Sequence, residues 1–358
     1  MLNIFFAVNR SCNLRCRYCY LPLERRSDSE AADAQAEAAL DNLLAKAERE
    51  GMDIGNVHLH GAEPGLLAPE ALGRMVTAIH DRSSRLVGIQ TNGTMIDEGW
   101  LDRLECAMPS RGILKIGVTL DGPKTIHEIM RGRSFDRAWA GLAELNRRGY
   151  QTYVLSCIGG HTVERLDAYA AWVEDLIARR QFLFFQLLAG LHGMTADQQI
   201  RFADWLYDSG QIWRCLGFQA GLCSLAGNDC FWLELGADGK AYSCNKGYSA
   251  ELAFADWRDM SLAEVITARR SLYVGHAVDP ACQGCRAWSL CHGGCPLERS
   301  EARANDCALR LRLFDRLRAD GQDLGTFIAA NRHLAAAYYA RARSLDAVSR
   351  RFDTTRKS

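Results

Sequence analysis

The chain has 358 residues, and its 43 basic residues (Lys and Arg) balance its 43 acidic residues (Asp and Glu), so its formal net charge is zero. This balance argues against a large nucleic-acid-binding surface, which would carry a basic excess. No apolar run of about 18 residues occurs, so no membrane-spanning helix is expected. Fourteen cysteines without a secretory signal indicate a cytoplasmic protein whose thiols bind metal rather than form disulfides.

Residues 1–210 alternate between apolar runs typical of buried strands and amphipathic runs typical of helices. Strands are predicted over residues 2–8, 54–60, 86–91, 113–120, 150–158 and 182–188. Helices are predicted over residues 29–50, 69–80, 97–106, 135–148, 163–179 and 197–207. Six β-then-α units at intervals of roughly 30 residues predict an α/β fold with a parallel sheet. Functional residues are expected at the carboxyl ends of these strands.

Three cysteines, Cys12, Cys16 and Cys19, follow the first predicted strand directly. Three thiolates can hold three corners of a cubane iron–sulfur cluster and leave the fourth iron open, whereas a closed zinc site needs four protein ligands. The alternatives are a zinc knuckle completed by a distant ligand, a redox dithiol at Cys16 and Cys19, or chance clustering. A dithiol leaves Cys12 without a role.

The spacing CxxxCxxC, with the aromatic Tyr18 before its last cysteine, resembles the signature of the radical S-adenosylmethionine (SAM) enzymes. The resemblance implies that Cys12, Cys16 and Cys19 hold a [4Fe–4S] cluster that binds SAM. One electron then cleaves SAM to methionine and a 5′-deoxyadenosyl radical, which abstracts a substrate hydrogen atom. Tyr18 would pack near the adenine or form an ordinary apolar wall. The implied fold is a partial, laterally open (β/α)6 TIM-like barrel.

Three further strand ends carry motifs of the same family. Gly61-Ala62-Glu63-Pro64 resembles its Gly-Gly-Glu-Pro turn, whose backbone carbonyls take the SAM amino group, with Ala62 in place of the second glycine. Asn92 would reach the SAM ribose or carboxylate. Thr119 and either Arg131 or Arg133 would bind the SAM carboxylate. Each motif alone would be an ordinary turn or a solvated arginine.

From residue 211 the βα rhythm stops, and nine cysteines fall between Cys215 and Cys307. The run CxxCx5CxxxC that starts at Cys282, with its neighbours, resembles the SPASM domain, which usually carries two auxiliary [4Fe–4S] clusters. The resemblance assigns one cluster to Cys223, Cys230, Cys244 and Cys295, with Cys215 as an alternative to Cys223. It assigns the other to Cys282, Cys285, Cys291 and Cys307. Two four-cysteine zinc sites are the alternative.

The expected domains are a barrel over residues 1–210, a SPASM domain over 211–318 and a helical segment over 319–358, with helices at 308–318 and 324–351. Cys157, at the end of the fifth strand, either donates a hydrogen atom to a substrate radical or is simply buried. Sulfatase-maturing members of the family carry an aspartate where this chain has Asn245, and an amide cannot accept a proton at neutral pH. Sulfatase maturation is therefore disfavoured unless Asp121 or His292 acts as the base.

The resemblance implies a radical SAM/SPASM enzyme that oxidises or crosslinks its substrate. A ribosomally made peptide in natural-product maturation is the expected substrate. The alternative is a dehydrogenase or epimerase of an amino sugar or cyclitol in antibiotic biosynthesis. A non-enzymatic zinc-binding interaction module is a further alternative. Expected partners are a reductant such as flavodoxin or ferredoxin and a separate leader-peptide recognition protein, because the chain starts at the first barrel strand.

Overall fold

The computed structural model describes residues 2–21, 30–83, 85–215, 232–243, 253–273, 278–291, 293–294, 299–300 and 303–322. The chain divides into two compact units. Unit 1 comprises Met1–Leu155, Leu176–Phe182 and Phe231–His276, and unit 2 comprises Ser156–Asp175, Leu183–Cys230 and Ala277–Ser358. Within the described ranges, no helix has both the length and the apolar character needed to cross a membrane.

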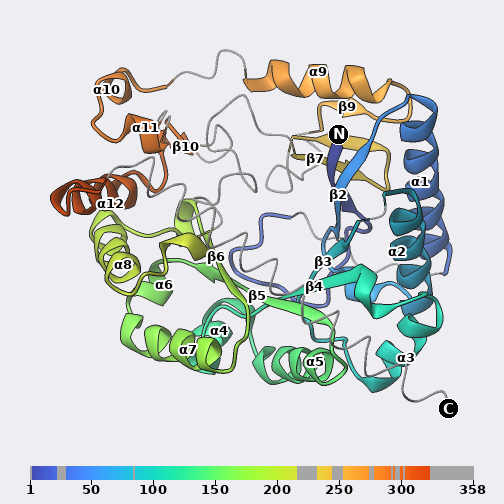
Figure 1. Cartoon of the computed structure of the whole chain (residues 1–358), viewed down its shortest axis with the longest axis horizontal. Coiled ribbons are helices and arrows are strands. Elements are labelled where there is room, and N and C mark those ends of the chain that lie inside the picture. Colours follow the sequence, from blue (N-terminus) through green and yellow to red (C-terminus); the bar gives the residue numbers. More distant parts are fainter. Residues whose placement is uncertain are drawn as a thin grey trace. The chain divides into compact units, whose positions relative to one another are not determined.

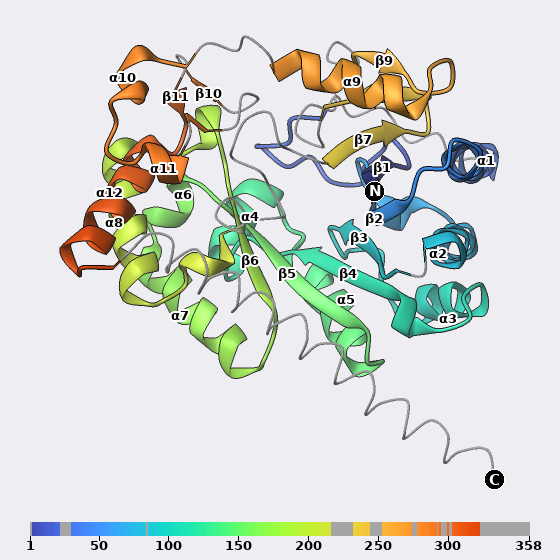
Figure 2. The same cartoon turned by 45° about the horizontal axis from the view of Figure 1, so that its top comes forward.

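Unit 1 is built on a mainly parallel sheet (Figures 1 and 2). Its strands, in the order β5-β4-β3-β2-β1-β7-β8-β9, are Gln151–Ile158, Leu114–Thr119, Val87–Thr91, Ile54–His60, Leu2–Ala7, Trp232–Gly236, Lys240–Tyr242 and Ala255–Asp256. Strands β1 to β5 and β7 run parallel to one another. Strand β8 pairs antiparallel with β7, and β9 pairs antiparallel with β8. The parallel sheet predicted from the sequence is confirmed. Strand β7 was not predicted, although it extends the sheet at the β1 edge.

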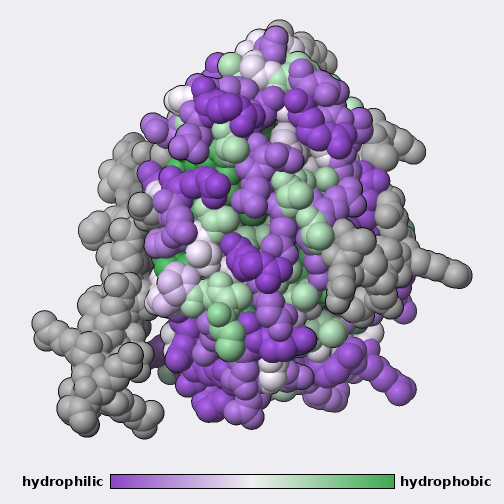
Figure 3. Space-filling view, turned by 90° about the vertical axis from the view of Figure 1, so that its right-hand side faces the viewer, coloured by the Kyte–Doolittle hydropathy of each residue, from purple (hydrophilic) through white to green (hydrophobic). Residues whose placement is uncertain are grey.

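The helices of unit 1 follow the strands of the sheet in turn. They are α1 (Glu30–Arg49), α2 (Pro69–Ser83), α3 (Glu98–Cys106), α4 (Lys124–Arg131), α5 (Phe135–Arg147) and α9 (Leu262–Tyr273). Helix α1 packs beside α2, and α2 beside α3 (Figure 2). Hydrophilic residues dominate the side of the molecule on which these three helices lie (Figure 3). Helix α4 was not predicted, because Asp121-Gly122-Pro123 and Gly132 indicate turns.

The two faces of this sheet differ in burial. On one face, Ile4, Leu59 and Ile116 are at most 1% exposed, as expected where helices cover a sheet. On the other face, Phe5, His58 and Lys115 are partly exposed. The alternation along each strand therefore separates a packed face from a partly open one.

Unit 2 contains β6 (Leu183–Leu187), which continues beside the end of β5, where the Leu188 N–H donates to the Ile158 carbonyl at 2.8 Å. Its helices are α6 (Gly160–Val163), α7 (Leu166–Ala178), α8 (Ala196–Asp208), α10 (Pro280–Gln283), α11 (Trp288–Cys291) and α12 (Cys307–Ala319). The two-residue strands β10 (Arg299–Ser300) and β11 (Arg303–Ala304) pair antiparallel. The helix predicted over residues 163–179 corresponds to α7, which begins three residues later, and α6 was not predicted.

Helix α12 packs against α8. The Gln199 side chain donates to the Asn305 carbonyl at 2.8 Å and accepts from the Leu309 N–H at 3.2 Å. Arg312 pairs with Asp204 at 2.8 Å. The helix predicted over residues 308–318 corresponds to α12, and the one predicted over 324–351 lies outside the described residues. The expected boundaries at residues 210 and 318 stay predictions, since the compact units divide the chain elsewhere.

Candidate active site

The three cysteines of unit 1 lie on the loop that follows β1. The Cys19 N–H donates to the Cys16 carbonyl at 3.0 Å, and the Leu14 N–H donates to the Cys12 Sγ at 3.3 Å. The Arg17 N–H donates to the Met130 carbonyl at 2.8 Å, which ties the loop to α4. All three thiols are free and partly buried. The loop therefore presents three thiols without a disulfide between them.

The thiols lie close enough to influence one another. Burial raises the pKa of Cys16 to about 11; Arg131 lowers it, and Asp121, Cys19 and Cys12 raise it further. Among the described residues, no three Cys, His, Asp or Glu side chains converge on a single metal ion. A cubane cluster binds each thiolate at a different iron, so it needs no such convergence. Three thiols on one loop are a donor set that fits three corners of such a cluster.

Glu63 forms the centre of a buried hydrogen-bond network at the ends of β2 and β3. Its side chain is 2% exposed. The carboxylate accepts from the Gly65 N–H at 2.8 Å, the Thr91 hydroxyl at 2.5 Å and the Asn92 N–H at 2.7 Å. Burial raises the pKa of Glu63, and these three donors partly offset the rise. Because it joins two strand ends, this carboxylate fixes the position of Asn92.

Asn92 connects the network to the cysteine loop. Its Nδ2 donates to the Asn13 Oδ1 at 2.8 Å and lies 3.8 Å from the Cys12 Sγ. Its Oδ1 accepts from the Thr94 N–H at 2.9 Å and the Thr94 hydroxyl at 2.7 Å. The side chain predicted to reach SAM thus lies directly beside a predicted cluster ligand.

The turn before Glu63 requires glycine at its first position only. Gly61 has φ +120°, and a Cβ there would lie 2.7 Å from the Asn9 carbonyl oxygen. Ala62 has no positive φ, and its N–H donates to the same carbonyl at 3.1 Å. Alanine therefore fits the position where the family motif has its second glycine.

Tyr18, Asp121 and Arg131 form a second polar network at this end of the sheet. The Tyr18 hydroxyl donates to the Asp121 Oδ2 at 2.7 Å and accepts from the Arg131 Nη1 at 2.5 Å. Asp121 is fully buried and Arg131 is 8% exposed, whereas Arg133 is exposed. The network includes Arg131, and Arg133 is turned to solvent. Tyr18 makes specific polar contacts beyond the apolar wall that its position predicts.

Two further groups hold this second network in place. The Asp121 N–H donates to the His127 Nδ1 at 3.2 Å, and the His127 Nε2 lies 2.9 Å from the Ser134 hydroxyl oxygen. Burial lowers the pKa of His127 to about 3, and the charge of Arg131 adds to this effect. The Thr119 hydroxyl, also predicted to bind SAM, accepts from the Gln90 amide at 2.9 Å.

The partly open face of the sheet carries polar residues that were not predicted as functional. Burial lowers the pKa of His58 to about 3, with contributions from Lys115 and His60. Glu234 is fully buried, neither of its carboxylate oxygens has a hydrogen-bond partner among the described residues, and burial raises its pKa well above the usual value. The alternation Val57-His58-Leu59-His60 was the available signal for a polar face.

Four cysteines of unit 2, Cys282, Cys285, Cys291 and Cys307, line a common hollow. It holds about 300 Å³ of space not filled by atoms, including the part open to solvent. Ala287, Trp288, Gly293, Ala304, Arg310 and Leu311 complete its lining. None of the four forms a disulfide with another described cysteine. Four thiols around a mainly apolar hollow fit a four-thiolate cluster.

The other predicted residues are buried or undescribed. Cys157 is 8% exposed, near the end of β5, and Cys215 is fully buried in unit 2. Burial raises the pKa of Cys215, followed by Asp306, whereas Arg310 lowers it. The remaining predicted residues lie outside the described residues: Cys223, Cys230, Cys244, Asn245, His292 and Cys295.

The amino-terminal part of the chain matches a known protein family. Residues 7–173, which include the cysteine loop, Glu63, Asn92 and Arg131, match the Radical SAM superfamily. The chain contains a radical SAM domain. A radical SAM domain implies SAM and an iron–sulfur cluster as cofactors, and this domain and the sulfatase-maturating relatives indicate an enzyme.

Relatives extend the similarity beyond the radical SAM domain. The serine-type anaerobic sulfatase-maturating enzyme of Klebsiella aerogenes is 25% identical over 334 residues, covering 83% of this chain and 80% of that protein. Native anSMEcpe with bound AdoMet and Cp18Cys peptide has a TM-score of 0.70 at 18% identity, covering 89% of this chain and 97% of that one. Streptococcus suis SuiB bound to its precursor peptide SuiA has a TM-score of 0.60 at 15% identity, covering 86% and 75%. The two structures show a shared fold.

Proposed function

We propose that this radical SAM enzyme modifies a ribosomally made peptide by a two-electron oxidation or crosslink. The observation that carries the proposal is the occurrence of both a three-cysteine loop in unit 1 and a four-cysteine hollow in unit 2 of the same chain. The relatives named above mature sulfatases or bind peptides, which supports a peptide substrate. The amino-sugar or cyclitol alternative is not favoured by these relatives.

In the proposed site, Cys12, Cys16 and Cys19 hold a cluster that, when reduced, supplies the electron that cleaves SAM to methionine and a 5′-deoxyadenosyl radical. Glu63 fixes the turn whose backbone would bind the SAM amino group, and it holds Asn92 beside the loop. Arg131 would provide a planar cation for the SAM carboxylate, and Thr119 would be a further hydrogen-bond partner. These residues position the cosubstrate and limit the access of water.

The two-electron outcome requires a second electron acceptor. After one hydrogen atom leaves the substrate, loss of one further electron and one proton gives an oxidised or crosslinked product. Auxiliary clusters held by the cysteines between Cys215 and Cys307 would accept that electron. We further propose a flavodoxin or ferredoxin as reductant and a separate protein that recognises the leader of the peptide.

The proposal is tested on the full-length protein after anaerobic reconstitution with iron and sulfide. Three clusters predict about twelve iron atoms per chain. The variant Cys12→Ala/Cys16→Ala/Cys19→Ala should lose 5′-deoxyadenosine formation. The matched variant Cys282→Ala/Cys285→Ala/Cys291→Ala/Cys307→Ala should keep about eight irons and still cleave SAM without peptide. SAM cleavage by the first variant would contradict the assignment of the three-cysteine loop.

The substrate class is tested with peptides that relatives bind. Purified enzyme, SAM and a reductant are incubated with Cp18Cys or SuiA peptide, or with short peptides encoded beside the gene, and the products are measured by mass spectrometry. A cognate peptide should lose two hydrogen atoms and raise 5′-deoxyadenosine formation. Because Asn245 lacks a basic carboxylate, Cp18Cys should stay unmodified. Its oxidation would make sulfatase maturation the better assignment.

A further inference from the structure

One buried ion pair lies beside the cysteine-lined hollow of unit 2. Arg310, on α12, is 2% exposed and lines the hollow together with Cys291 and Cys307. Its guanidinium forms two hydrogen bonds to the Asp306 carboxylate, Nε to Oδ1 and Nη2 to Oδ2, each 2.7 Å long. Asp306 directly precedes Cys307 in the chain. The pair therefore lies at the hollow, because Arg310 lines it and Asp306 is next to one of its cysteines in the chain.

Both charges of the pair act on the thiols of this region. Burial raises the pKa of Cys291; Arg310 lowers it, and Asp306 raises it. The same two charges act in the same opposite directions on the buried Cys215. Because the Asp306 side chain is 19% exposed and that of Arg310 only 3%, the cation is the more deeply buried partner. The field at the hollow thus has a positive and a negative contribution that can be removed separately.

An iron–sulfur cluster with four thiolate ligands carries net negative charge, and reduction adds another. A buried cation stabilises the reduced state more than the oxidised state, and a buried anion does the opposite, because charges interact strongly in a poorly polarisable interior. Net charge around a cluster is one of the factors that set its reduction potential. A charge pair at the edge of such a site therefore sets the potential as well as supporting the fold.

We propose that the Arg310–Asp306 ion pair sets the reduction potential of the iron–sulfur cluster held by Cys282, Cys285, Cys291 and Cys307. Arg310 raises that potential, and Asp306 limits the rise. Both are positioning residues that bind neither SAM nor the peptide. The inference rests on the cluster of the proposed function, and it is independent of which peptide the enzyme modifies.

The test measures the midpoint potential of this cluster by redox titration monitored by electron paramagnetic resonance. The measurement uses full-length protein carrying Cys12→Ala/Cys16→Ala/Cys19→Ala, which lacks the signal of the SAM-site cluster. The signal that disappears when Cys282, Cys285, Cys291 and Cys307 are also replaced by alanine is the signal of the hollow. Arg310→Gln should lower the midpoint potential, and Asp306→Asn should raise it. The double variant should return towards the parent value. Arg312→Gln, a change on the same helix outside the hollow, should leave the potential unchanged.

Opposite shifts separate an electrostatic role from a purely structural one. A structural role would move both single variants in the same direction or release iron from both, and either result would overturn the proposal. If Arg310→Gln alone releases iron, Arg310→Lys serves as the second variant. It keeps the positive charge, so the cluster should stay near the parent midpoint potential. A clear fall of the midpoint potential in Arg310→Lys would overturn the inference. If the protein binds iron and sulfide but gives no paramagnetic signal that depends on the four cysteines of the hollow, the cluster of the proposed function is contradicted instead.

Discussion

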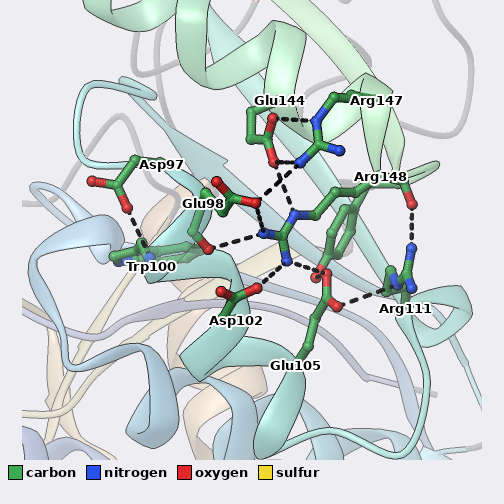
Figure 4. A network of polar contacts seen from close by, with 10 residues as sticks. Asp97, Glu98, Trp100, Asp102, Glu105, Arg111, Glu144, Arg147 and Arg148 are labelled. Atoms are coloured by element: carbon green, nitrogen blue, oxygen red, sulfur yellow. Dashed lines mark hydrogen bonds and ion pairs between the residues drawn. The ribbon is translucent and has the colours of Figure 1, made fainter.

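The two ends of the strands in unit 1 both carry charged networks, and they differ in how far their carboxylates are buried. At the carboxyl ends, Glu63, Asp121 and Arg131 are each at most 8% exposed and surround the cysteine loop. The second network lies on the helices that precede β4 and β5. There Arg148 pairs with Asp102 on α3 at 2.7 Å and with Glu144 on α5 at 2.9 Å (Figure 4). The side chains of Glu98 and Asp102 in this second network are 75% and 63% exposed.

This difference separates two uses of charge. A buried carboxylate or guanidinium is destabilising unless nearly every hydrogen bond is made, so charges are kept at the carboxyl ends where a polar ligand requires them. Exposed ion pairs contribute little to stability. Sites of βα folds lie at the carboxyl ends of their strands. Mutations at the two ends should therefore differ in size and in what they impair.

Removal of the Glu63 carboxylate should have the largest effect. Glu63→Ala leaves the buried Gly65 and Asn92 N–H groups without an acceptor, which should lower the free energy of unfolding by about 3 kcal/mol. Asn92 would lose its anchor beside Cys12, so SAM binding and 5′-deoxyadenosine formation should be lost. Thermal unfolding and equilibrium binding of SAM to the reconstituted protein measure the two effects.

The matched control is Glu70→Ala on α2, where a 40% exposed carboxylate faces Arg103 at 3.8 Å. This change should leave SAM binding unchanged and unfolding within about 0.5 kcal/mol of the parent. Equal losses from Glu63→Ala and Glu70→Ala would remove the distinction between buried and exposed carboxylates.

Loss of the Tyr18 hydroxyl should have an intermediate effect. Tyr18→Phe keeps the ring but removes the group that donates to Asp121 and accepts from Arg131, whose Nε lies 4.0 Å from the Asp121 Oδ2. Stability should fall by about 1.5 kcal/mol, and affinity for SAM by about tenfold, since Arg131 loses one of its positioning contacts. Calorimetry with SAM measures the affinity. Tyr207→Phe, at a surface hydroxyl of unit 2, is the control, and unchanged SAM affinity in Tyr18→Phe would deny the network a role in binding.

The sequence was sufficient for most of the unit 1 sheet, because each strand is apolar and ends in a turn motif. It could not decide between Arg131 and Arg133, which lie two residues apart, because the choice depends on α4 and its end at Gly132. The contact of Tyr18 with Asp121 and the pairing of β1 with β7 join residues distant in the chain, for which local patterns carry no signal. Burial in the fold, rather than residue type, separates these candidate side chains from surface ones.

Removal of the Arg148 guanidinium should have the smallest effect of the three changes and no effect on chemistry. Arg148→Gln leaves the carboxylates of Glu98, Asp102, Glu105 and Glu144 near one another, but Glu98 and Asp102 are 75% and 63% exposed. Stability should fall by about 1 kcal/mol at low salt, and by less at high salt, because mobile ions screen exposed charges. Unfolding at two salt concentrations, with SAM cleavage measured in parallel, checks both points. A loss of SAM cleavage in the folded variant would mean that the two ends of the strands are coupled.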